Sequence, residues 1–381
     1  MLKIESRQFI KDHELYACIQ CGKCTGGCPM AMKTKLNPRS LIYRIMLSGN
    51  GYDIEGREEL WDCTTCNTCS SRCPKQVSPM ETIIALRGAF VEKGRVHPNV
   101  KTALESTFRH GNPLTMPRED RAAWVGDLPV KLMADEVALN HNPDYLYFVG
   151  CTPSYDPRIQ QVTRSIVNLF QQGGVDFGIL GEEESCCGSE IRRLGEQGLF
   201  EMMVEEYQEV FKGYNIQKMF TTSPHCYNAF KNDYPKSGMK VQHYTEVLAN
   251  RLASGDLKLS GNFEKKITYH DPCYLGKHNQ VFDEPRAVLQ SVPGVTLIEM
   301  DRSREKSLCC EGGGGRMWLE GTNPSTRLAQ MRVNEALETG AEILATACPF
   351  CLLTLDEAVK HLNAQDKIRV MDVAEIAAQA L

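Results

Sequence analysis

From residue 145 onward the chain alternates short apolar runs with longer amphipathic stretches. The short runs are rich in β-branched and aromatic residues and have the length of buried strands. They are YLYFVGC (145–151), VDFGIL (175–180), KMFTT (218–222), KITYHDPC (266–273), VTLIEM (295–300) and EILAT (342–346). The stretches between them carry apolar residues at helical spacing, the first of them at Ile159, Val162, Ile166 and Leu169. Strands that alternate with helices predict parallel sheets.

Before residue 111 the pattern is helical. NPRSLIYRIMLSG (37–49) predicts a helix that begins at Asn-Pro and ends at glycine. Two further stretches place apolar residues at helical spacing, at Ile83, Leu86 and Phe90 and at Val100, Leu104 and Phe108. Residues 111–144 contain four prolines and little periodicity, which is typical of a linker or a wrapping segment.

The last two thirds of the chain contain a repeat. Cys151 is matched by Cys273, 122 residues later, and Cys186-Cys187 by Cys309-Cys310, 123 residues later. SPHC (223–226) is matched by CPFC (348–351), and the stretch 239–252 by 368–381. Such constant offsets predict a duplicated domain. We therefore predict an α+β protein with a helical part (1–110), a linker (111–144) and two α/β domains with parallel sheets (145–260 and 261–381).

Composition narrows the class of protein. The chain has 381 residues, 42% of them apolar and 24% charged, with a net charge of −5, so no basic domain favours nucleic-acid binding. No apolar run approaches the ~18 residues of a membrane span, and the N-terminus is too charged for a signal peptide. We expect a cytoplasmic protein that docks, if at all, on a membrane partner. Disulfides do not persist there, so the 17 cysteines indicate metal ligation.

Eight of the cysteines form two copies of the spacing C-x2-C-x2-C-x3-C-P, at 18–29 and 63–74. This is the run of two-cluster ferredoxins, in which three thiolates hold one 4Fe–4S cube and the fourth crosses to the other. The predicted ligands of the first cluster are Cys18, Cys21, Cys24 and Cys73, and those of the second are Cys63, Cys66, Cys69 and Cys28. The alternative of two structural zinc sites fits poorly, because zinc sites use separated C-x2-C pairs.

Nine cysteines remain, and they fall where the predicted strands end, the usual place for ligands in an open α/β sheet. Five lie in the last domain: Cys273, Cys309, Cys310, Cys348 and Cys351. An ordinary cube takes four thiolates. The first α/β domain has four, namely Cys151, Cys186, Cys187 and Cys226, because Ser223 stands at the position of Cys348.

The spacing C…CC…C-x2-C resembles the CCG domain of heterodisulfide reductases, a family that carries two such domains. With the ferredoxin-like part included, everything outside 111–144 resembles the fused catalytic subunit of the membrane-linked members. The arrangement is also similar to the related sulfite-reduction complex subunit and to iron–sulfur subunits of anaerobic glycerol-3-phosphate and glycolate dehydrogenases. The resemblance implies that the five cysteines of the last domain bind a noncubane 4Fe–4S cluster that cleaves disulfides.

Several residues depart from this pattern or leave two interpretations open. With Ser223 in its set, the first α/β domain holds a conventional cube, a depleted cluster or none. Glu311 follows Cys310 where the first domain has Gly188. Gly312 and Gly313 either let backbone N–H groups approach cluster sulfides or belong to a flexible loop.

Two histidines lie beside predicted ligands. His270, three residues before Cys273, is a candidate proton donor, although a structural hydrogen bond is the interpretation we favour. His225 lies next to Cys226 and has a weaker claim.

Two functions follow from the resemblance. The first is a catalytic subunit of a hetero-oligomeric complex that reduces a thiol-derived disulfide or a related sulfur substrate. Its electrons would come from a flavoprotein or a membrane cytochrome, because the chain has no nucleotide-binding glycine fingerprint or haem motif. The second is a non-catalytic electron relay in a larger flavin- or quinone-linked or acyl-CoA or aryl-CoA reductase complex.

Overall fold

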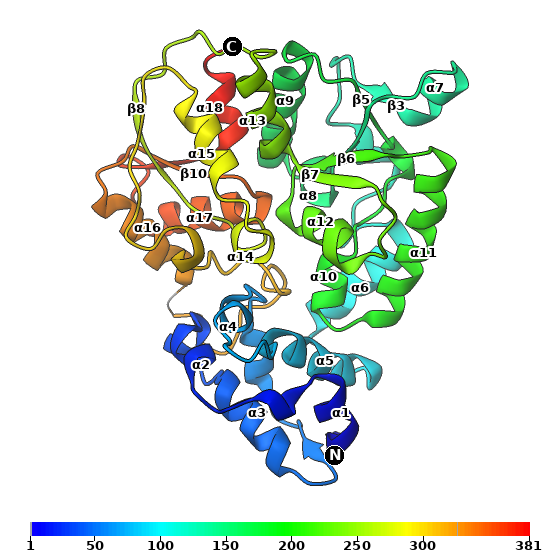
Figure 1. Ribbon diagram of the computed structural model, residues 1–381, viewed down its shortest axis with the longest axis vertical. Coiled ribbons are helices and arrows are strands. Elements are labelled where there is room, and N and C mark those ends of the chain that lie inside the picture. The colour runs from blue at the N-terminus through cyan, green and yellow to red at the C-terminus, as the bar shows by residue number, and fades with distance from the viewer. Residues whose placement is uncertain (1, 326) are drawn as a thin grey trace.

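The computed structural model describes residues 2–325 and 327–381. Figure 1 shows a helical N-terminal domain below two α/β lobes that lie side by side. The N-terminal domain contains a two-stranded antiparallel sheet and six helices. Its elements are β1 (Lys3–Ile4), α1 (Ser6–Asp12), α2 (Lys23–Gly27), α3 (Pro38–Leu47), β2 (Tyr52–Asp53), α4 (Thr68–Ser71), α5 (Pro79–Glu92) and α6 (Pro98–His110).

Local chemistry explains where these helices begin. The Asn37 side chain accepts a hydrogen bond from the Ser40 N–H at the start of α3, and proline occupies the first helical position. Ser78 caps α5 in the same way. The predicted helix 37–49 is therefore confirmed, but the predicted apolar face of α6 is wrong at its end, where Phe108 is 66% exposed. Each four-residue step overshoots a 3.6-residue turn by about 40°, so Phe108 has rotated away from the buried side.

The first lobe contains a five-stranded parallel sheet in the order β3-β5-β4-β6-β7. Its elements are β3 (Lys131–Leu132), α7 (Met133–Ala138), β4 (Tyr145–Phe148), α8 (Cys151–Tyr155), α9 (Pro157–Gln172), β5 (Phe177–Ile179), α10 (Ser189–Arg193), α11 (Gln197–Gly213), β6 (Lys218–Thr221), α12 (Pro224–Asn228), β7 (Lys240–His243) and α13 (Tyr244–Ser254). Strand β3 comes from the segment 111–144, so this segment adds an edge strand to the sheet besides connecting two domains.

The second lobe has a four-stranded parallel sheet in the order β11-β10-β8-β9. Its elements are β8 (Lys265–Tyr269), α14 (Gly276–Asn279), α15 (Asp283–Gln290), β9 (Val295–Leu297), α16 (Leu328–Glu338), β10 (Ile343–Thr346), α17 (Pro349–His361), β11 (Arg369–Asp372) and α18 (Val373–Ala378). The order β9-β8-β10-β11 repeats β5-β4-β6-β7, so the predicted duplication and the parallel sheets are confirmed.

The two lobes share one hydrophobic core. Helices α9 and α13 of the first lobe pack against α15 and α18 of the second, and Ile166, Val288 and Ile376 are fully buried in the same cluster. Two polar contacts cross this interface: Tyr244 Oη donates to Asp372 Oδ1 at 2.5 Å, and Arg158 pairs with Glu375 at 2.6 Å. The paired lobes therefore hold their cysteine-bearing strand ends in a fixed relation.

Candidate metal centres

All 17 cysteines have free thiols, and the fold gathers them into four groups. We name these by position: the outer set (Cys18, Cys21, Cys24, Cys73), the inner set (Cys28, Cys63, Cys66, Cys69), the four-cysteine set (Cys151, Cys186, Cys187, Cys226) and the five-cysteine set (Cys273, Cys309, Cys310, Cys348, Cys351).

The outer set lies in the loops around α2. Helix α4 packs against α2, and Cys73 follows α4 just as Cys28 follows α2. The crossing of the fourth ligands between the two motifs remains a prediction for Cys73. Cys21 is exposed, whereas burial raises the pKa of the Cys24 thiol.

The inner set lines one small cavity with all four of its thiols, so Cys28 does cross to the second motif. Burial, followed by the neighbouring thiols of Cys66 and Cys63, raises the pKa of Cys28 to about 12. Burial also raises the pKa of Cys63 to about 11. Four thiols that are this reluctant to ionise alone need a cation among them, which suits a cluster that binds thiolates.

Two buried cations beside the inner set provide an independent test of that fit. Arg87 is fully buried, and its guanidinium donates only to backbone carbonyls, including those of Leu60 and Cys63 at 2.7 to 3.1 Å. Lys277 Nζ donates to Thr68 Oγ1 at 2.9 Å and Ser307 O at 2.6 Å. Neither forms an ion pair with a carboxylate of the described residues. Buried charge requires an opposite charge, and thiolate-bound iron–sulfur clusters supply it.

The five-cysteine set converges at the carboxyl ends of β8 and β10. Each of its residues is at most 9% exposed, and the sulfurs of Cys310 and Cys351 lie 3.2 Å apart. Cys309 contacts Cys273 and Cys310. Burial raises the pKa of Cys348, but hydrogen bonds from Cys351 and His225 outweigh it and lower this pKa to about 5.

The inner and five-cysteine sets lie against each other. The thiol of Cys309, together with burial, holds the pKa of Cys66 well above its ordinary value. Cys309 Sγ also lies 3.4 Å from Thr64 Oγ1. The structure thus places the inner set of the N-terminal domain directly beside the second lobe, as the position of α4 in Figure 1 also shows.

His270 is a buried neutral residue. Burial, followed by the nearby Arg332 guanidinium, lowers its pKa to about 3. Arg332 Nε donates to His270 Nδ1 at 3.1 Å, which leaves the ring proton on Nε2. One ring nitrogen, Cys310 Sγ and Cys351 Sγ lie within 4.8 Å of one another. The structural hydrogen bond that we favoured is therefore present, and a catalytic role for His270 remains a prediction.

The four-cysteine set surrounds a cavity of about 310 Å³ between the lobes. Gly150 has a φ of +87°, and a Cβ atom there would lie 3.2 Å from Cys226 Sγ. Ser223 Oγ accepts the His225 N–H at 3.3 Å as the cap of α12, the position that Cys348 occupies before α17. The hydroxyl that replaces a thiol is thus engaged in helix capping.

His225 is more central than the sequence indicated. Its Nδ1 pairs with Glu190 Oε1 at 2.9 Å, and its ring stacks on Tyr274 with centroids 4.0 Å apart. Burial lowers its pKa, but hydrogen bonds with Cys348 of the second lobe and Glu190 raise it to about 9. His225 therefore belongs to the four-cysteine set by sequence and to the five-cysteine set by contact. No local signal marks Glu190, Arg87 or Lys277, because only tertiary structure brings them to the cysteines.

The glycine run after Cys310 is buried at the junction of all three domains. A Cβ atom on Gly312 would lie 3.2 Å from Phe350, and one on Gly313 would lie 3.1 Å from His225 Cε1. The Gly312 N–H also faces the Cys310 thiol. The flexible-loop interpretation is therefore wrong, because packing fixes these residues; their binding to a cluster remains a prediction.

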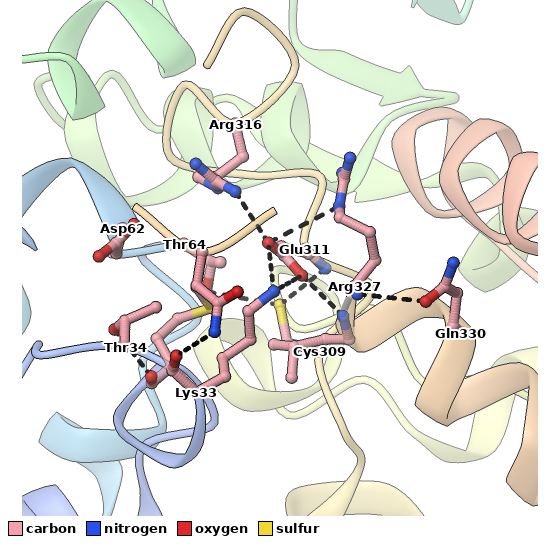
Figure 2. Close-up of polar contacts among 12 residues, drawn as sticks. Lys33, Thr34, Asp62, Thr64, Cys309, Glu311, Arg316, Arg327 and Gln330 are labelled. Carbon is pink, nitrogen blue, oxygen red and sulfur yellow. Dashed lines mark hydrogen bonds and ion pairs between the residues drawn. The ribbon is translucent and has the colours of Figure 1, made fainter. Parts of the chain in front are cut away.

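Glu311 occupies the position of Gly188 and keeps its left-handed backbone, with a φ of +68° against +75°. Figure 2 shows Lys33, Arg316 and Arg327 converging on its fully buried carboxylate. Lys33 Nζ lies 3.3 Å from both oxygens, and Arg316 Nη2 lies 2.8 Å from Oε1. Because Lys33 follows the first cysteine motif, Glu311 connects the N-terminal domain to the second lobe.

The fold and the four cysteine sets define an iron–sulfur oxidoreductase. The 4Fe–4S dicluster domain matches residues 14–77, and the cysteine-rich CCG domain matches residues 145–231 and 267–356. The N-terminal domain therefore carries 4Fe–4S clusters, and the two lobes are cysteine-rich domains of this type. None of the described helices combines the length and apolar character that a membrane span requires.

Curated proteins of related sequence narrow the class. The chain is 34% identical to the probable iron–sulfur-binding oxidoreductase FadF of Bacillus subtilis (strain 168), over 100% of this chain and 61% of that protein. It is 34% identical to the EtfAB:quinone oxidoreductase of Syntrophomonas wolfei, over 97% of this chain and 58% of that protein. It thus spans about three fifths of these two relatives.

A third relative is similar over nearly its full length. It belongs to the dihydromethanophenazine:CoB–CoM heterodisulfide reductase of Methanosarcina barkeri, and this reductase subunit is 32% identical, over 97% of this chain and 94% of its own length. The chain belongs to the family of iron–sulfur oxidoreductases that includes this heterodisulfide reductase subunit, as the cysteine spacing indicated.

Proposed function

We propose that this chain is the catalytic subunit of a complex that reduces a disulfide or a related sulfur substrate. The gathering of five buried thiols in one set, where an ordinary cube takes four, is the observation that carries the proposal. Two of the five, Cys309 and Cys310, are adjacent in sequence and suit two nearby irons better than two corners of one cube.

The five-cysteine set would hold a noncubane 4Fe–4S cluster, which would supply one-electron chemistry and a place for substrate sulfur. The chain's own residues prepare that place. The packed glycines Gly312 and Gly313 exclude bulky side chains and water from it. His270 Nε2 presents a proton toward the sulfurs of Cys310 and Cys351, and Arg332 fixes its tautomer.

The other sets would serve electron supply. The outer and inner sets would each hold a 4Fe–4S cube, with Cys73 and Cys28 exchanged between the motifs. The four-cysteine set would hold a fourth cluster in the 310 Å³ cavity that its thiols line. The donor would be a separate flavoprotein or membrane cytochrome, and the complex would be hetero-oligomeric on the cytoplasmic side of a membrane. The relatives named for EtfAB, quinone and dihydromethanophenazine support such a partnership.

A spectroscopic experiment tests the catalytic assignment. The anaerobically purified protein is reduced, and candidate thiols and disulfides are added while electron paramagnetic resonance spectra are recorded. We expect a new paramagnetic signal that depends on the thiol and disappears in Cys309→Ser. Spectra that stay unchanged with every thiol would contradict catalysis at the five-cysteine set.

Electron relay in a larger complex is the second candidate. The similarity to EtfAB:quinone oxidoreductase favours it, because that name describes transfer between a protein donor and a quinone. Iron analysis constrains both: about 12 irons indicate three clusters and about 16 indicate four. A count near eight would eliminate the cluster of the five-cysteine set and leave only relay through the N-terminal domain.

A further inference from the structure

The outer set opens to solvent on one face of the N-terminal domain. Of the 17 cysteines, all of which lie in the described part of the chain, Cys21 alone is exposed. Ile19 beside it is 61% exposed, and Tyr16 is 69% exposed. Exposed apolar side chains around a predicted cluster ligand indicate a surface that another protein covers.

Positive charge is concentrated around the same set. Residues 15–52 contain no aspartate or glutamate, although the chain as a whole has a net charge of −5. The basic residues of this stretch are Lys23, Lys33, Lys35, Arg39 and Arg44. Lys33 points inward to Glu311, and the other four are exposed.

Three exposed cations lie directly on the loops of the outer set. Lys23 is the first residue of α2. A Cβ atom on Gly22 would lie 3.7 Å from Arg39 Cδ, and one on Gly27 would lie 2.7 Å from Arg72 Nη1. Among residues 2–325 and 327–381, none of the three has a carboxylate partner.

Many surface cations elsewhere do have such partners. Arg95 pairs with Glu55 at 2.9 Å, and Lys265 pairs with Glu342 at 2.7 Å. The unpaired cations at the outer set therefore leave a positive potential where the protein as a whole is negative. Complementary potentials steer association and orient the partner.

We propose that an electron-transfer protein with an acidic surface docks on this docking face, defined by Ile19, Cys21, Lys23, Arg39 and Arg72. The inference rests on the proposed function in one respect, that the outer set holds a cluster. The partner is oxidised by one electron and this chain is reduced by one, with no bond made or broken. An anionic membrane would meet the same charges, but it offers no electron to the exposed Cys21.

The position of the docking face in the fold agrees with this role. Helix α2 lies at the outer side of the N-terminal domain, and α4 lies between α2 and α14 (Figure 1). The inner set around α4 contacts Cys309 of the five-cysteine set. The docking face is thus the end of the cysteine series farthest from the proposed catalytic set.

Charge reversal tests the proposal. The variant Lys23→Glu/Arg39→Glu changes two residues in the first turns of α2 and α3, where a carboxylate is favourable and folding is retained. The matched control is Lys212→Glu/Lys258→Glu, two exposed, unpaired lysines of the first lobe. Photoreduced flavodoxin, an acidic flavoprotein, serves as the donor in anaerobic stopped-flow experiments that follow bleaching of the iron–sulfur absorbance.

We expect Lys23→Glu/Arg39→Glu to be reduced about tenfold more slowly than the wild type at low ionic strength. The difference should vanish at high ionic strength, where charges are screened, and the control should match the wild type throughout. Basic cytochrome c as electron acceptor should show the opposite order of rates.

Three results would overturn the proposal. Equal rates at low salt would exclude charge steering, and a difference that persists at high salt would assign the effect to the cluster itself. Loss of binding to phosphatidylglycerol vesicles with unchanged flavodoxin rates would assign the face to a membrane. Failure of dithionite to bleach the wild type would instead refute the proposed function, so the two failures are distinguishable.

Discussion

Arg87 and Lys277 are buried cations beside the inner set, and their partners are uncharged oxygens. By contrast, Arg121 beside the four-cysteine set has a carboxylate, that of Glu184, at 2.8 Å. A fixed positive charge stabilises a neighbouring group more when that group gains an electron. The two cations should therefore raise the reduction potential of a cluster in the inner set.

Removing the charge of Lys277 should reverse this effect. We expect Lys277→Met to lower the midpoint potential of one cluster by about 59 mV, the equivalent of a tenfold change for one electron. A redox titration followed by electron paramagnetic resonance measures it, with Lys258→Met as the exposed control. An unchanged potential would mean that Lys277 serves only packing.

The glycines of the junction allow a clean test of packing against backbone strain. Gly314 and Gly340 have nearly equal φ values, +67° and +69°. A Cβ atom on Gly314 would lie 2.5 Å from the Cys63 carbonyl oxygen, whereas nothing lies within 4 Å at Gly340. Gly340→Ala should cost about 1 kcal/mol of unfolding free energy.

Gly314→Ala should cost several times more, because the clash adds to the same backbone strain, and it should also reduce the iron content. Denaturation curves and iron analysis measure both effects. Equal losses in the two variants would show that the junction relaxes around the added methyl group.

Among the elements, the loop that follows Cys310 determines how the N-terminal domain meets the second lobe. Glu311 accepts a left-handed backbone in order to bind Lys33 of the N-terminal domain and Arg316. The side chains of Lys33 and Glu311 are 7% and 0% exposed. Breaking a buried ion pair leaves a charge without a partner, which is costly.

Glu311→Gln should therefore lower the unfolding free energy by about 3 kcal/mol. Glu342→Gln, which removes an exposed ion pair with Lys265, should cause no measurable loss. Chemical denaturation compares the two. Similar stability of both variants would mean that Glu311 is not required to join the domains.

At the scale of the whole molecule, buried neutral histidines make stability depend on pH. Burial lowers the pKa of His243 to about 3, from 6.5 in an unfolded chain. A depressed pKa means that the unfolded state binds the proton more readily. The contribution is therefore complete above pH 6.5 and is lost as the pH falls towards 3.

At pH 5.5 His243 alone should have removed about 1.4 kcal/mol of stability relative to pH 7.5. His243→Gln should lose correspondingly less over this interval, while His97→Gln, at an exposed position, should behave as the wild type. Unfolding measurements at the two pH values provide the comparison. Parallel behaviour of all three proteins would contradict the assignment.

The cysteine motifs predicted much of the candidate site and the fold. Strand and helix periods located the sheets, and constant offsets revealed the duplication, because both follow from local spacing. The pattern did not show that residues 111–144 supply β3, since a two-residue edge strand has no detectable period. It also overestimated the buried face at Phe108 and underestimated His225, whose partners Glu190 and Cys348 lie far away in sequence.

The sequence by itself determined the ligand chemistry, the repeat and the class of protein, because thiol spacing and hydrophobic period are local properties of the chain. Only the tertiary structure decided which thiols lie together and which single cysteine faces solvent. It also decided which buried cations stand beside the inner set and that Glu311 joins two domains. Those contacts depend on how three domains pack at one junction, and packing depends on residues that are far apart along the chain.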